Sequence, residues 1–123
     1  MPRVALTIWG SRISPVFETA RRVRVVDVHG RRMIPVGDVD LLDHPQARIE
    51  CLREHQVQVV ICGALSHLDG SMLRAAGIGL VPFVTGEVDQ VLQAYVFGSL
   101  QSGKYAMPGC QRRHRRRQRR GRG

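Results

Sequence analysis

The sequence predicts an α/β domain built on one mixed, five-stranded sheet with three helices. Three observations lead to this fold class. Most of the first 40 residues lie in valine-rich segments that are typical of β-strands. The apolar spacing then changes to the helical period after residue 43. From there to residue 97, helical and strand-type segments alternate, as they do in proteins with parallel crossover connections.

The first half of the chain indicates three consecutive strands. Residues 3–9, RVALTIW, have two largely apolar faces, as expected of a central strand. Their alternating members are Val4, Leu6 and Ile8 on one face and Ala5, Thr7 and Trp9 on the other. Residues 10–15 are a loop by their Gly, Ser and Pro content, and residues 22–29 are a second strand. Residues 31–38 form a third strand at a sheet edge, because Pro35 cannot donate a ladder hydrogen bond.

The second half predicts helices at 45–55, at 66–76 and from about residue 86, with strands at 57–63 and 78–84 between them. The last helix carries apolar residues at i, i+3, i+4 and i+7: Val88, Val91, Leu92 and Tyr95. Short right-handed crossovers favour the strand order 3-2-1-4-5 with strand 2 antiparallel. This arrangement is a ribonuclease-H-like topology.

Charge is concentrated at the C-terminus. Eight arginines and no acid lie in residues 111–123, so they account for +8 of the net charge of +9 and leave +1 for the rest. We therefore expect a folded domain at 1–100 and a disordered Arg-rich tail at 101–123. The tail could bind a polyanion through seven closely spaced arginines: Arg112, Arg113, Arg115, Arg116, Arg117, Arg119 and Arg120.

The chain shows no sign of a membrane span, a secretion signal or a self-contained metal site. No apolar run approaches the roughly 18 residues that a spanning helix needs, and the N-terminus lacks a signal-peptide pattern. Three widely spaced cysteines without a CxxC motif argue against a disulfide framework or a zinc ribbon. We expect a cytoplasmic protein without a membrane partner.

Three segments carry a resemblance to a known family. They are VALTIWGSRISPVFETARRVRVVDV near the start, VQVVICGAL in the middle and AAGIGLVPFVTGEVDQVLQAYVFGSL near the end. Together they resemble the dinitrogenase iron–molybdenum cofactor biosynthesis family, the NifX-type domain also found at the C-terminus of NifB-type proteins. The resemblance implies a non-catalytic carrier or accessory protein for an iron–sulfur or molybdenum–iron–sulfur cluster or its precursor. Its implied partners are the cluster donor and acceptor proteins of cofactor assembly.

Candidate site residues follow from the fold. Ligands prefer the carboxyl ends of strands where strand order reverses, here between strands 3–9 and 57–63. Cluster iron takes thiolate or imidazole ligands, which makes His44, Cys62 and Cys110 the candidate metal ligands. Arg12 could balance the charge of a cluster, and His67 could reach the same crevice.

Two other functions remain open at this stage. One is nonspecific nucleic-acid binding through the tail, and the other is a partner-docking domain without a cofactor. An enzyme is not expected. A ribonuclease-H nuclease needs converging carboxylates for two divalent metals, and the first strand contains no acid.

Overall fold

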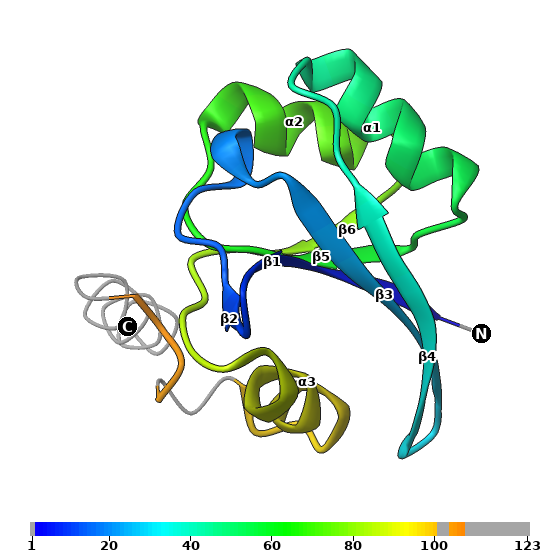
Figure 1. The fold of residues 1–123 in the computed structure, drawn as a ribbon, viewed down its shortest axis with the longest axis vertical. Helices are drawn as coiled ribbons and strands as arrows, with labels where there is room; N and C mark the ends of the chain where they lie inside the picture. Colours follow the sequence, from blue (N-terminus) through cyan, green and yellow to red (C-terminus); the bar gives the residue numbers. More distant parts are fainter. Residues whose placement is uncertain (1, 101–103, 108–123) are drawn as a thin grey trace, which may run out of the picture.

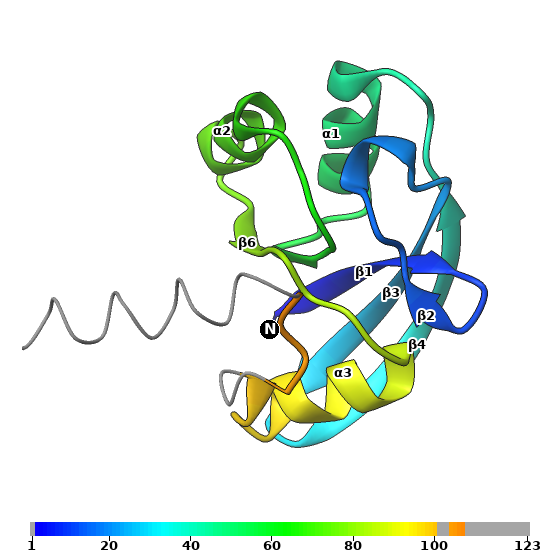
Figure 2. The same ribbon diagram turned by 90° about the vertical axis from the view of Figure 1, so that its left-hand side faces the viewer.

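The structure, a computed structural model, describes residues 2–100 and 104–107. Six strands form one sheet: β1 (Arg3–Trp9), β2 (Arg12–Ile13), β3 (Arg22–His29), β4 (Arg32–Asp40), β5 (Val59–Ile61) and β6 (Gly79–Val81). The helices are α1 (Pro45–Glu54), α2 (His67–Ala75) and α3 (Val88–Val96), with a short 3-10 turn, η1 (Phe17–Thr19). Helices α1 and α2 cover one face of the sheet and α3 covers the other (Figures 1 and 2).

The predicted mixed α/β sheet with three helices is confirmed, but the strand count of five is wrong. The main path of the sheet runs β4-β3-β1-β5-β6, and β2 pairs with β1 outside this path. Residues 12–13, predicted as loop, fold back so that Ile13 pairs with Ile8 and Arg12 with Trp9. The predicted order, written for five strands, therefore differs in detail from that of the six-stranded sheet. Strand β3 runs antiparallel to β1 and β4, whereas β5 is parallel to β1 and β6.

Strand β1 is the centre of the core, as its two apolar faces predict. Its residues 4–8 are all buried. Ala5 belongs to the cluster beneath α1 and α2, which also includes Ile49, Leu52 and Leu73. Val4, Leu6 and Ile8 belong to the cluster beneath α3, with Val88, Val91 and Leu92. The period-2 pattern of the strand thus assigns each residue to one of two layers.

Local sequence explains where the helices begin. Pro45 occupies the first turn of α1, where the absent N–H costs no hydrogen bond. Helix α2 is capped by Ser66, whose Oγ accepts the N–H of Asp69 at 3.1 Å. Leu68, in the first turn of this helix, is apolar but 66% exposed.

A segment after β2 closes the end of the sheet between β1 and β5. The Ala64 N–H donates to the Pro15 carbonyl at 2.8 Å, and the Phe17 N–H donates to the Ala64 carbonyl at 2.7 Å. The Ser14 N–H donates to the carbonyl of Thr7 on β1 at 2.9 Å. Residues 14–17, which we call the strap, are therefore bonded to the ends of both strands.

Residues 104–107 attach to the body rather than leaving it. Tyr105 accepts the N–H of Thr85 at 2.7 Å, and the Met107 N–H donates to the Phe83 carbonyl at 2.9 Å. The rest of the predicted tail, with Cys110 and the arginines from Arg112 to Arg120, lies outside the described residues.

The strap requires glycine at position 63. A Cβ there would lie 2.4 Å from the Pro15 carbonyl oxygen and 2.5 Å from that of Ser14. We predict that Gly63→Ala lowers the free energy of unfolding by about 1–3 kcal/mol, the usual cost of overpacking. Urea denaturation measures the change in the free energy of unfolding, with Gly70→Ala as the control.

Gly70 lies within α2, and a Cβ there meets its nearest atoms at 3.6 and 3.7 Å. The control should be neutral or more stable by about 0.5–1 kcal/mol, the helix-propensity difference. Equal stability of the Gly63→Ala variant and the wild type would contradict the close packing of the strap.

Candidate functional site

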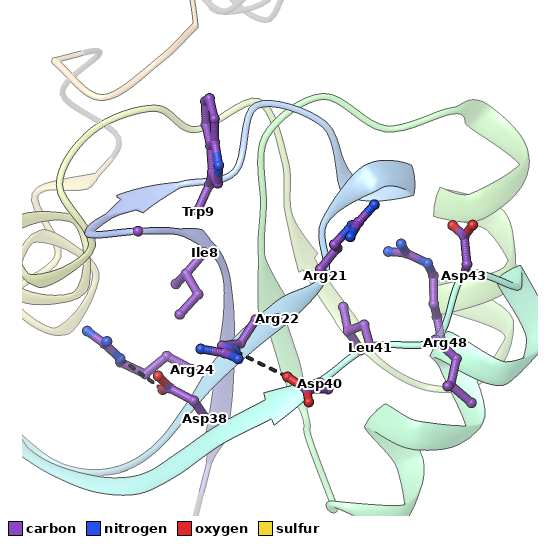
Figure 3. A pocket seen from close by; sticks show the side chains of 12 residues that line it. Ile8, Trp9, Arg21, Arg22, Arg24, Asp38, Asp40, Leu41, Asp43 and Arg48 are labelled. Carbon is purple, nitrogen blue, oxygen red and sulfur yellow. Dashed lines mark hydrogen bonds and ion pairs between the residues drawn. The ribbon is translucent and has the colours of Figure 1, made fainter.

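An open pocket of about 790 Å3 lies where β1 ends, β3 begins and β4 ends (Figure 3). Its lining comes from these strands, from the β4–α1 loop and from α1: Ile8, Trp9, Gly10, Arg21, Arg22, Arg24, Asp38, Asp40, Leu41, Leu42, Asp43 and Arg48. Four of these side chains are cationic and three are anionic, so the lining has a net charge of +1. It lies on the β3 side of β1, whereas the predicted crevice lay on the β5 side.

Two of the arginines belong to cross-strand ion pairs. Arg22 stands opposite Asp40 and Arg24 opposite Asp38 in the β3–β4 register. In both pairs the arginine Nε lies 3.1 Å from an aspartate Oδ1 (Figure 3). The side chain of Arg21 makes no hydrogen bond or ion pair with any described residue. Of the pocket's four guanidinium groups, that of Arg21 is therefore unpaired among the described residues, those of Arg22 and Arg24 are ion-paired, and that of Arg48 is buried.

Arg48 fixes the wall of the pocket nearest α1. It is only 2% exposed, and its guanidinium donates to the carbonyls of Phe17 and of Ala20. The guanidinium also lies 5.5 Å from the centre of the Phe17 ring, within the range of a cation–π contact. Because Ala20 directly precedes Arg21, the buried Arg48 positions the start of the segment that carries Arg21, Arg22 and Arg24.

Two exposed apolar side chains also line the pocket. Trp9 is 73% exposed and Leu42 is 62% exposed, and both line the pocket. Trp9 follows the last buried residue of β1, and Gly10 after it has the positive φ of +62° that the turn into β2 needs. As the sole tryptophan of the sequence, Trp9 is also a specific fluorescent reporter of this pocket.

The structure separates the predicted site residues. His44 is the exposed N-cap of α1 and follows Asp43 of the pocket lining, and His67 is the exposed first residue of α2. Arg12 is exposed, with its Nη1 3.9 Å from Glu87 Oε1. Cys110 lies outside the described residues.

Cys62 lies in the core and does not line this pocket. Its side chain is 0% exposed within the cluster beneath α1 and α2. Burial, and then the charge of Glu18, raise the pKa of this thiol to about 12. The crevice expected between β1 and β5 is covered by the strap, which explains why the end of β5 is enclosed.

The side chains of the described residues determine whether they could hold a metal ion or cluster. Among residues 2–100 and 104–107, no group of three or more His, Cys, Asp or Glu side chains could hold a metal ion. The described chain therefore does not fit a cluster ligated by several thiolates. The described pocket instead offers arginine guanidinium groups, which can donate charge-assisted hydrogen bonds to an anion.

The fold and the pocket define an α/β domain with an arginine-lined pocket, and the comparisons with known proteins give its family. The family model for the dinitrogenase iron–molybdenum cofactor matches residues 1–98. The chain belongs to this family, as the resemblance in its sequence predicted. A comparison with curated proteins found no match.

Solved structures share the fold. The protein PH0822 is 23% identical, with a TM-score of 0.73 over 78% of this chain and 91% of its own. The apo form of the orange protein from Desulfovibrio gigas is 25% identical, with a TM-score of 0.66 over 80% and 90%. A candidate NifB protein from Thermotoga is 23% identical, with a TM-score of 0.60 over 80% and 90%.

These comparisons favour a cofactor-related function over the nucleic-acid alternative.

Within the described residues, none of the helices is both long and apolar enough to cross a membrane.

The burial of Cys62 predicts that it is chemically inert in the folded protein. A thiol with a pKa of about 12 is almost entirely protonated at pH 8, and no solvent reaches it. We expect iodoacetamide at pH 8 to leave Cys62 unmodified in native protein and to alkylate it fully in urea. Peptide mass spectrometry resolves the three cysteines. Alkylation of native Cys62 at the rate of a free thiol would show that the strap does not cover it.

Proposed function

We propose that the protein is a non-catalytic carrier or accessory protein for a metal–sulfur cluster of iron–molybdenum cofactor assembly, or for a precursor of that cluster. The observation that carries the proposal is the arginine-lined pocket at the end of β1. The family match supports the cofactor, and the lack of a thiolate set among the described residues supports a cargo that is held loosely and passed on.

The cargo would be recognised mainly by its charge. Sulfide-rich molybdenum and iron–molybdenum species are anions, and arginine is the side chain best suited to bind them by charge-assisted hydrogen bonds. Arg21, without a protein partner in the described chain, is the first contact we assign. His44, one residue beyond Asp43 of the lining, supplies one imidazole ligand in this proposal.

The indole of Trp9 and the side chain of Leu42 would border the same cargo. Their exposure leaves the pocket open at its rim, so that a donor or acceptor protein could approach a cluster in the pocket. We infer that the partners are the cluster donor and acceptor proteins of cofactor assembly.

Tetrathiomolybdate, a compact molybdenum–sulfur dianion, tests the proposal. Isothermal titration calorimetry should show binding to the full chain, and the fluorescence of Trp9 should change on the same titration. Arg21→Gln should weaken the affinity about fivefold, because an exposed charge contact contributes up to about 1 kcal/mol. Higher salt should weaken binding as well.

Arg53→Gln is the matched control, since Arg53 is exposed on α1 and does not line the pocket. It should bind like the wild type. No binding by the wild type, or equal losses in the two variants, would contradict the proposed site. A loss in His44→Ala far larger than in Arg21→Gln would mean that imidazole ligation, and not charge, holds the cargo.

A further inference from the structure

The two arginines of β3 already have acidic partners, and Arg24 has a second one in Asp89 of α3, with its Nη1 3.8 Å from Asp89 Oδ1. Arg22 and Arg24 stand opposite Asp40 and Asp38, with nitrogen–oxygen distances of 3.1 Å in both pairs. Arg22 and Arg24 are two residues apart on β3, as Asp38 and Asp40 are on β4. Side chains two residues apart on a strand point to the same face, so both pairs project from one face of the sheet. All four side chains line the pocket.

These pairs must affect any anion that enters. The Arg22 and Asp40 side chains are 56% and 81% exposed, and those of Arg24 and Asp38 are 33% and 36% exposed. Ion pairs this exposed are weak enough to be displaced. An anion that contacts Arg22 or Arg24 must share the guanidinium with an aspartate, and it also meets the repulsion of that carboxylate.

We propose that Asp38 and Asp40 are built-in competitors for the pocket's arginines, which lower the affinity for anionic cargo and speed its release. This inference rests on the proposed carrier function. A carrier must bind its cargo and also give it up, and affinity differences at one site act mainly through the dissociation rate. The two aspartates therefore set the release rate of the cargo, while Arg21, without a competitor in the described chain, provides the capture.

The experiment compares Asp40→Asn and Asp38→Asn with the wild-type full chain, using tetrathiomolybdate as the probe. Asparagine keeps the size of the side chain and removes its charge. Each variant should bind about two- to fivefold more tightly, the range that an exposed ion pair provides. Stopped-flow fluorescence of Trp9 should show that most of the gain comes from slower dissociation.

The chain contains a matched control at the other end of the sheet. Arg3 and Asp27 also form a cross-strand pair, with Nε and Oδ1 2.8 Å apart, but neither lines the pocket. Asp27→Asn should leave the affinity unchanged. In an Arg22→Gln background, Asp40→Asn should lose most of its gain, which a merely structural effect of the substitution would not do.

The outcomes separate the two proposals. If the wild type binds the probe and the Asp38 and Asp40 variants bind no more tightly, the competition is overturned and the carrier function stands. If the wild type and all variants fail to bind, the carrier function is overturned together with this inference. A gain in Asp27→Asn equal to that in Asp40→Asn would also overturn the competition, because a general change in charge would then explain both.

Discussion

The close approach of Gly63 to the strap determines how the sheet is closed between β1 and β5. A backbone without a Cβ lets the carbonyls of Ser14 and Pro15 lie directly against the end of β5. The hydrogen bonds between Pro15, Ala64 and Phe17 then close the gap between β1 and β5. An α/β sheet normally offers its ligand crevice at this point, and here the protein's own backbone fills it.

Closing one side of β1 leaves the other side as the place for a ligand. The strap continues into η1, which Arg48 fastens to α1 by two hydrogen bonds to main-chain carbonyls. The chain then enters β3 with Arg21 and Arg22 facing the pocket. The same segment that covers Cys62 thus leads directly into the strand that carries the pocket arginines.

Much of the fold could be predicted because its signals are local. The two apolar faces of residues 3–9 identify the central strand, and the spacing of Val88, Val91 and Leu92 identifies the helix on its far side. Strand β2 could not be found, because two residues show no periodicity and their pairing with Ile8 and Trp9 depends on the turn at Gly10. Strands β5 and β6 are shorter than predicted. The apolar runs continue past them, but there Phe83 and Val84 donate to the carbonyls of Gly63 and Cys62 outside the regular strand pairing.

The site was harder to predict. Cys62 was correctly placed at the end of a strand, but its burial depends on a backbone segment almost 50 residues away in the sequence. Arg21, Arg22 and Arg24 were missed because the valines between them dominate the strand pattern. A usable signal existed: arginines at 22 and 24 and aspartates at 38 and 40 have matching spacing on two strands predicted to be neighbours.

We propose that anionic cargo binds on the β3 side of β1 and not beside Cys62. Anomalous diffraction at the molybdenum edge, from crystals of the protein grown with tetrathiomolybdate, tests it most directly. We expect a molybdenum peak in the pocket, within reach of the Arg21 guanidinium and bordered by Trp9. A peak beside Cys62 beneath the strap, with the strap displaced, would contradict it.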